Sequence, residues 1–202
     1  MSRIKILSDN LINKIAAGEV LERPVSAVKE LLENSIDAKA KKIDIFIRNG
    51  GKSEITVSDD GTGIEKEDLK RSVLRHATSK LNSEKLNQIK TMGFRGEALS
   101  SIVSVSDFIM RSNIFNSTDG YEISLSSGNL KHVKPVNQKK GTYVSVKNIF
   151  FSTPARLKFL KSENYESLLI KRLLKKFALI NVKTQFNLFV DKKVIIKTTL
   201  FK

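Results

Sequence analysis

The sequence predicts an α/β (α+β) fold, a two-layer sandwich of a mixed, largely antiparallel sheet with helices on one face. Three observations support this prediction. The chain of 202 residues is 40% hydrophobic, which is enough for one substantial core. Some stretches place apolar residues at helical spacing, whereas others alternate apolar with polar residues. Neither a repeat nor a Pro/Gly-rich linker divides the chain, so we expect one domain over residues 1–202.

A helix is predicted at residues 24–38, because Pro24 suits a first helical turn and the apolar residues after it recur at helical spacing. Its buried stripe would consist of Val25, Val28, Leu32 and Ile36. Next, residues 43–47 and 55–57 alternate apolar with polar side chains, on either side of the turn-forming sequence NGG at 49–51. This pattern predicts a β-hairpin.

The same two periodicities predict the remaining elements. Further strands are predicted at 106–111, 121–126, 143–150, 184–190 and 193–199. Further helices are predicted near 65–75, 96–104 and 163–180. Residues 1–20 are expected to form an N-terminal arm. Its apolar segment IKIL at 4–7 fits either packing on a partner subunit or covering the chain's own core.

The composition excludes several kinds of site. The chain has no cysteine, so it has no disulfide, no thiolate metal site and no cysteine nucleophile. No apolar run reaches the roughly 18 residues of a membrane span, and the first residues lack the apolar core of a signal peptide. We therefore expect no membrane association. The expected location is cytoplasmic for a bacterial source with an AT-rich genome, and nuclear for a eukaryotic one.

The net charge of +15 is unevenly distributed along the chain. Lys and Arg outnumber Asp and Glu by 19 to 18 in residues 1–130, but by 17 to 3 in residues 131–202. The excess of Lys over Arg, 27 to 9, is what AT-rich coding would produce without any selection for phosphate contacts. Because such a bias alone would spread the charge evenly, a solvated surface and a nucleic-acid interface both remain open for the last third.

A polar stripe runs along the predicted helix at 24–38. Glu30, Asn34 and Asp37 lie at i, i+4 and i+7, on one face and away from the apolar stripe. Taken alone, this pattern fits a solvated helix face. A carboxylate and an amide one turn apart can also perform chemistry, because the carboxylate can take a proton from water while the amide oxygen ligates Mg²⁺.

The segment SDDGTGI at 58–64 directly follows a predicted strand and precedes a predicted helix. Its glycines permit positive φ and the close approach of a ligand ring to the backbone. A buried aspartate at this place can accept a hydrogen bond from an exocyclic amine such as that of adenine. An ordinary turn is the alternative interpretation of the segment.

Three further segments are compatible with phosphate or nucleotide contacts. The segment GFRGE at 93–97 lies just ahead of a predicted helix, where free backbone amides suit a phosphate. The segment TSK at 78–80 offers hydroxyls and an ammonium, and the pair GT at 141–142 opens a predicted strand. Taken singly, the first two are more typical of a flexible surface loop, and the GT pair is a weaker signal still.

Together and in this order, these segments resemble the GHKL ATPases, the superfamily of DNA gyrase B subunits, ninety-kilodalton heat-shock chaperones, histidine kinases and MutL proteins. The segments KIAAGEVLERP, VKELLENSIDA, RHATSK, GFRGEALSSI and STPARLKFL resemble MutL proteins in particular, and the match runs from about residue 4 to the C-terminus. The resemblance implies a Bergerat-type fold and an Mg-dependent ATPase, with ATP and Mg²⁺ as cofactors. It also implies a conformational switch in DNA mismatch repair.

The resemblance assigns a role to each motif residue. Glu30 would be the general base, Asn34 the Mg²⁺ ligand and Asp59 the group that recognises the adenine amine. Gly61, Gly63 and Thr142 would complete the adenine pocket. The lid over the phosphates would consist of Thr78, Ser79, Lys80, Gly93, Phe94, Arg95, Gly96 and Glu97. One residue departs from the family pattern, because Asp60 stands where relatives often have Asn.

MutL proteins continue into a transducer domain, which supplies a lysine to the γ-phosphate, and then into a C-terminal dimerisation domain. Neither follows Lys202 in this sequence, so weak or absent turnover is expected. The implied partners are a MutS-type mismatch-sensing protein, a downstream nuclease or helicase, a second copy of the chain in an ATP-dependent dimer, and DNA bound without sequence preference. The DNA-contact candidates are Lys139, Lys140, Arg156, Lys158 and Lys161.

Two other functions compete with this hypothesis. Another GHKL ATPase, such as a histidine kinase, is disfavoured because only 29 residues precede Glu30, too few for an upstream phosphoacceptor helix. A non-enzymatic basic nucleic-acid-binding domain is the alternative from a different class. In such a domain the SDDGTGI segment would be a structural turn, and DNA binding would not respond to ATP.

Overall fold

The computed structural model describes residue 5 and residues 9–80, 91–93, 96–114 and 119–200. Its strands are β1 (Lys42–Arg48), β2 (Glu54–Asp59), β3 (Asp107–Asn113), β4 (Gly120–Ser126), β5 (Asn129–Val136), β6 (Gly141–Lys147), β7 (Gln185–Val190) and β8 (Lys193–Lys197). Its helices are α1 (Asp9–Val20), α2 (Pro24–Asp37), α3 (Lys66–Arg71), α4 (Ala98–Ser104), α5 (Pro154–Phe159) and α6 (Glu163–Ile180), with one 3₁₀ turn, η1 (Asn49–Gly51). None of the helices in these ranges is long and apolar enough to span a membrane.

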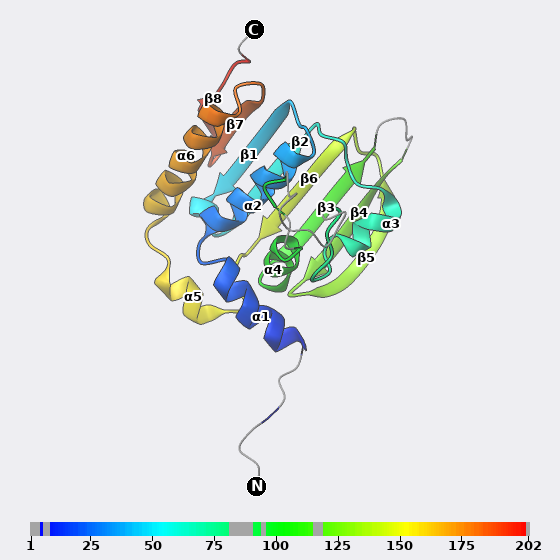
Figure 1. Ribbon diagram of the computed structural model, residues 1–202. Helices are drawn as coiled ribbons and strands as arrows, with labels where there is room; N and C mark the ends of the chain where they lie inside the picture. Colours follow the sequence, from blue (N-terminus) through cyan, green and yellow to red (C-terminus); the bar gives the residue numbers. More distant parts are fainter. Residues whose placement is uncertain (1–4, 6–8, 81–90, 94–95, 115–118, 201–202) are drawn as a thin grey trace.

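The strands form one mixed sheet in the order β5-β4-β3-β6-β2-β1-β7-β8. Strands β1 and β7 pair in parallel, and every other neighbouring pair is antiparallel. The helices lie over one face of the sheet, with α2 across its centre and α6 toward the β7–β8 edge (Figure 1). The predicted fold class is therefore confirmed.

The core lies between α2 and the central strands. Alternate residues of β1 point toward the helices and are buried, and on α2 Val28 and Leu32 are fully buried. The other two residues of the predicted stripe, Val25 and Ile36, are only partly buried. The hairpin is confirmed, with Ile45 opposite Val57. Its turn is the 3₁₀ turn η1, in which all three residues have positive φ.

Three elements were not predicted, and two of them lack the pattern that a prediction requires. Strand β5 lies at the sheet edge, most of its residues are exposed and it contains Pro135, so it shows no clear alternation. Helix α5 has six residues and none is buried, which leaves no apolar stripe. Helix α1 falls within the segment that was expected to be an arm.

A buried ion pair fixes the start of α2 against α6. The Nη1 of Arg23, the residue before α2, donates to Glu166 Oε1 at 2.6 Å, and Glu166 is fully buried. The backbone amide of Lys161 donates to the same oxygen at 2.9 Å. Because a carboxylate in the interior needs such partners, these contacts hold the helix that carries the polar stripe.

Candidate functional site

A large cleft opens between α2 and the strands β2 and β6. The predicted nucleotide-site residues that line it are Glu30, Asn34, Asp59, Gly63, Thr78, Ser79, Lys80, Gly93, Gly96, Glu97 and Thr142, and the DNA-contact candidate Lys140 lines it too. Gly61 is adjacent but does not line the cleft. Two predicted residues, Phe94 and Arg95, lie outside the described residues, as do Ile4, Ile6 and Leu7 of the arm. The fold thus gathers segments that are more than 100 residues apart in the sequence.

Asp59, the last residue of β2, is held by three donors. Ser35 Oγ donates to its Oδ2 at 2.7 Å, and the amides of Gly61 and Thr142 donate to its Oδ1 at 2.9 and 3.2 Å. Burial raises the pKa of Asp59, and the three hydrogen bonds oppose this change without cancelling it. A carboxylate oxygen has about two acceptor sites, so Oδ2 can accept one more hydrogen bond. An exocyclic amine in the cleft would be a suitable donor.

The glycines of this region let backbone segments approach one another. A Cβ on Gly63, whose φ is 78°, would lie 2.0 Å from the carbonyl oxygen of Asn113. A Cβ on Gly141, whose φ is 111°, would lie 2.0 Å from the carbonyl oxygen of Asp59. These glycines are therefore required by contacts within the chain, whether or not they also admit a ligand ring.

The departure at Asp60 has a structural explanation. Asp60 Oδ1 accepts hydrogen bonds from the amides of Lys41 and Lys42 at 2.7 and 2.9 Å, at the start of β1. An asparagine amide oxygen can accept the same two hydrogen bonds. Either residue would therefore fix β1 to the segment that follows β2.

Glu30 lies on α2 with its side chain about three-quarters buried, since 23% of it is exposed. Burial raises the pKa of its carboxyl most strongly; the nearby Lys29 lowers it, and the carboxylate of Glu33 raises it further. Lys29 Nζ lies 3.5 Å from Glu30 Oε1 and 2.9 Å from Glu33 Oε1. A carboxylate with a raised pKa is a better proton acceptor, as a general base requires.

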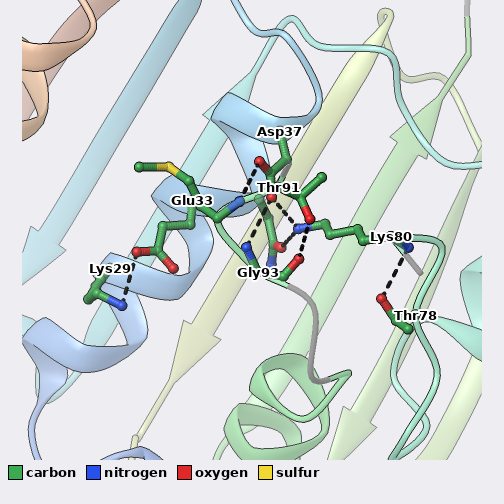
Figure 2. A network of polar contacts seen from close by, with 9 residues as sticks. Lys29, Glu33, Asp37, Thr78, Lys80, Thr91 and Gly93 are labelled. Carbon is green, nitrogen blue, oxygen red and sulfur yellow. Dashed lines mark hydrogen bonds and ion pairs between the residues drawn. The ribbon is translucent and has the colours of Figure 1, made fainter. Parts of the chain in front are cut away.

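Lys80 and Asp37 form a polar network (Figure 2), and Asn34 joins it through Lys80. Lys80 Nζ donates to Asn34 Oδ1 at 2.8 Å and to Asp37 Oδ2 at 2.6 Å. The amides of Met92 and Gly93 donate to the two carboxylate oxygens of Asp37 at 3.1 and 3.3 Å. The Asn34 oxygen thus already faces a cation, which fits the role of a metal ligand.

Clusters of metal-ligating side chains are absent from the part of the chain that the structure describes. No group of three or more acidic or histidine residues there could hold a metal ion. Mg²⁺ does not need such a group, because it usually keeps several waters and takes one or two protein oxygens together with substrate phosphates. The single oxygen of Asn34 is compatible with this mode of binding.

Gly96 and Glu97 face the segment at 75–77. The amide of His76 donates to the Gly96 carbonyl at 3.0 Å, and Glu97 Oε1 lies 3.7 Å from both Arg75 Nη2 and His76 Nδ1. A Cβ on Gly96 would lie 2.6 Å from the carbonyl oxygen of Ala77. Gly96 and Glu97 of the predicted lid therefore contact residues 75–77, which directly precede the other predicted lid segment at 78–80.

The five DNA-contact candidates fall into two groups. Lys139 and Lys140 precede β6, whereas the other three follow it, on α5 or just before α6. Arg156 is turned inward: its Nη1 is buried, and a Cβ on Gly18 of α1 would meet its Nη2. The candidates therefore do not form a single patch, and the Arg156 guanidinium packs on α1.

Two serines of the site were missed in the sequence. Ser35, which holds Asp59, directly follows Asn34 but has no pattern of its own. Ser112, on β3, shares a 3.0 Å hydrogen bond with Thr142 Oγ1 and accepts one from the amide of Ile64 at 2.8 Å. Only the pairing of β3 with β6 brings it there. Asp37 was placed on the polar stripe, without a role.

Comparisons with known proteins agree with this geometry. A family model described as histidine kinase-, DNA gyrase B- and HSP90-like ATPase matches residues 22–149. The DNA mismatch repair protein MutL of Clostridium tetani is 47% identical over 199 residues, which are 98% of this chain and 32% of that protein. The MutL of Aquifex aeolicus is 47% identical over 195 residues, which are 96% of this chain and 46% of that protein.

A solved structure extends the likeness to the fold. The Aquifex aeolicus MutL ATPase domain complexed with ADP superimposes with a TM-score of 0.77 at 38% identity, covering 91% of this chain and 66% of that one. The chain spans about a third of the Clostridium protein and less than half of the Aquifex protein.

Proposed function

Because this chain belongs to the histidine kinase-, DNA gyrase B- and HSP90-like ATPase family and corresponds to the ATPase domain of MutL proteins, we propose that it binds Mg·ATP in the cleft beside α2. We propose further that ATP drives a conformational switch in DNA mismatch repair. The observation that carries the proposal is the buried carboxylate of Asp59, fixed by three donors in the same cleft as Glu30 and Asn34.

In the proposed mechanism, Asp59 accepts a hydrogen bond from the adenine amine and Asn34 ligates Mg²⁺. When bound, the metal would neutralise charge on the phosphates. Glu30 takes the proton from a water whose oxygen attacks the γ-phosphorus, and the bond from that phosphorus to the β–γ bridging oxygen breaks to release ADP. Slow turnover suits a switch whose output is the ordering of chain segments.

The partners form part of the same proposal. They are DNA bound without sequence preference, a MutS-type mismatch-sensing protein, a downstream nuclease or helicase, and a second copy of the chain in an ATP-dependent dimer. The support is the likeness to MutL proteins of bacteria, which also supports a cytoplasmic location.

The test is the affinity for a non-hydrolysable ATP analogue with Mg²⁺, compared between the parent chain and Asp59→Asn. The asparagine can keep the fold, since its oxygen can accept from the two amides while its Nδ2 donates to Ser35. The adenine amine would then face another donor, and we expect affinity to fall about 10- to 100-fold. Equal affinity of parent and variant, both folded by circular dichroism, would contradict the adenine assignment.

A further inference from the structure

Asp37 has contacts that helix stability alone does not explain. It is the last residue of α2, where a negative charge opposes the helix dipole. Its side chain is only 10% exposed, and its carboxylate accepts from the ammonium of Lys80 and from the amides of Met92 and Gly93. Two separate segments of the chain, at 78–80 and 91–93, therefore meet on this carboxylate.

Lys80 links Asp37 to the proposed metal ligand. Its Nζ is 2.8 Å from Asn34 Oδ1, and its side chain is 20% exposed. A magnesium ion on that oxygen would stand about 2.1 Å from it. Two cations at such distances from one neutral oxygen repel each other strongly in a partly buried site. Lys80 and a metal ion therefore compete for Asn34.

Gly93 packs closely against this ammonium. A Cβ at Gly93 would lie 3.3 Å from Lys80 Nζ and 4.0 Å from Asn34 Oδ1. The amide of Gly93 also bonds to Asp37 at 3.3 Å. The backbone at 93 is thus placed so that Lys80 can reach both Asp37 and Asn34.

We propose that Asp37 is a positioning residue that holds Lys80 beside Asn34, so that Lys80 and the nucleotide's metal ion occupy the Asn34 oxygen in turn. Lys80 leaves Asn34 when the metal binds, and Asp37 keeps its ammonium next to the site. The pair keeps the local charge balanced, with one negative and one positive group. This inference rests on the proposed binding of Mg·ATP.

The charge balance gives a direct test. The measurement is the Mg²⁺ concentration that gives half-maximal binding of a non-hydrolysable ATP analogue. Asp37→Asn leaves the ammonium unbalanced, so the midpoint should rise about tenfold, since one charge at short range alters cation affinity by that order. Lys80→Met leaves the carboxylate unbalanced, so the midpoint should fall. Asp37→Asn combined with Lys80→Met restores the balance, and the midpoint should return to within about threefold of the parent.

Control variants separate this role from a structural one. Asp37→Glu keeps the charge and should keep the midpoint closer to the parent value than Asp37→Asn does. A comparable Asp–Lys pair lies outside the cleft, where Lys42 Nζ is 2.9 Å from Asp44 Oδ2. Asp44→Asn breaks this pair and should leave the Mg²⁺ midpoint unchanged.

Two outcomes overturn the inference, and they differ. If Asp37→Asn leaves the midpoint unchanged, or if adding Lys80→Met to it does not bring the raised midpoint back toward the parent value, the charge balance of Asp37 and Lys80 does not set the Mg²⁺ dependence, while the ATP site stands. If the parent chain shows no Mg²⁺-dependent binding of the analogue, the proposed function fails and the role of Asp37 fails with it.

Discussion

At the scale of single residues, the chemistry depends on a glutamate whose proton affinity is altered by its surroundings. Replacing Glu30 with Gln removes the proposed base and keeps the shape of the side chain. We expect analogue binding to be retained and single-turnover phosphate release to slow about 10²- to 10⁴-fold. Phosphate release at the parent rate would exclude Glu30 as the base.

The same residue predicts a pH dependence. A base must be unprotonated, and burial raises the pKa of Glu30 above its ordinary value. Hydrolysis should therefore rise with pH through that raised pKa, and Glu30→Gln should lose this limb of the pH profile. The control is analogue affinity over the same pH range.

A second carboxylate, that of Glu122 on the helix-free face of the sheet, has a pKa shifted in the opposite direction, below its ordinary value. Burial acts to raise the pKa of Glu122, but hydrogen bonds from His132, Arg111 and Lys134 lower it to about 2. Because the folded-state pKa is below the ordinary value of 4.5, ionised Glu122 stabilises the fold at pH values above 4.5. That contribution is lost as the pH falls toward about 2.

The matching variant is Glu122→Gln, which should lose this acid-dependent part of the free energy of unfolding. The chain has no tryptophan, so urea unfolding should be followed by far-UV circular dichroism at several pH values. The free energy of unfolding could instead fall equally steeply in the parent and the variant between pH 4.5 and about 2. That result would show that the ion pairs of Glu122 do not contribute to stability.

At the scale of elements, the sequence predicts those helices and strands whose residues show a clear local pattern. Alternation over 43–47 and 55–57 was sufficient for the hairpin, and helical spacing was sufficient for α2. Order within the sheet is not local. The amide of Thr142 reaches Asp59 only because β6 pairs with β2, and nothing in either segment specifies that pairing.

The site was predictable to the same degree. Motif residues such as Glu30 and Asn34 could be named from their spacing on one helix and from family resemblance. Their contacts could not, since Lys80 was named only as a lid residue and Ser35 was not named at all. Which of them reaches Asp59 or Asn34 depends on how loops return to α2, and that follows from the whole fold.

The junction of β2 and β6 predicts a contrast between two glycines. Gly141, at the start of β6, and Gly128, in the turn before β5, both have positive φ, but only Gly141 meets backbone atoms at Cβ distance. Gly128→Ala should cost about 1 kcal/mol of stability, from backbone strain alone. Gly141→Ala should cost about 3 kcal/mol, because overpacking adds to strain.

Urea unfolding measures both variants, and analogue binding adds a second measurement. Gly141→Ala should also weaken binding, since its new Cβ displaces the backbone of Asp59. Gly128→Ala should bind like the parent chain. Equal costs for the two substitutions would mean that the close approach at Gly141 is readily relieved.

At the scale of the whole molecule, the DNA-contact candidates other than Arg156 fall into two groups, one before β6 and one after it. Lys139 and Lys140 lie before this strand of seven residues, while Lys158 and Lys161 lie beyond it. Lys52 joins the second group, because its Nζ donates to the carbonyl of Lys161 at 2.7 Å. We expect DNA to contact the second group.

The test is the salt dependence of binding to duplex DNA. Replacing Lys158 and Lys161 together with Ala should reduce the slope of log affinity against log salt by about 2, because each phosphate contact contributes about 0.9. Replacing Lys139 and Lys140 together should leave the slope near that of the parent. The reverse result would place the DNA on the cleft side of the sheet.

The parallel pairing of β1 with β7 has a consequence for the synthesis of the protein. Strand β1 ends at Arg48 and pairs with β2 on one edge, but its partner on the other edge, β7, begins only at Gln185. At about 5 to 20 residues per second, β7 emerges from the ribosome roughly 7 to 30 s after β1. During that interval β1 has an unpaired edge that can join another nascent chain. A ribosome-bound chain that ends before residue 185 contains every residue proposed to bind ATP, from Glu30 to Thr142, yet lacks β7 and β8, the two strands that complete their sheet.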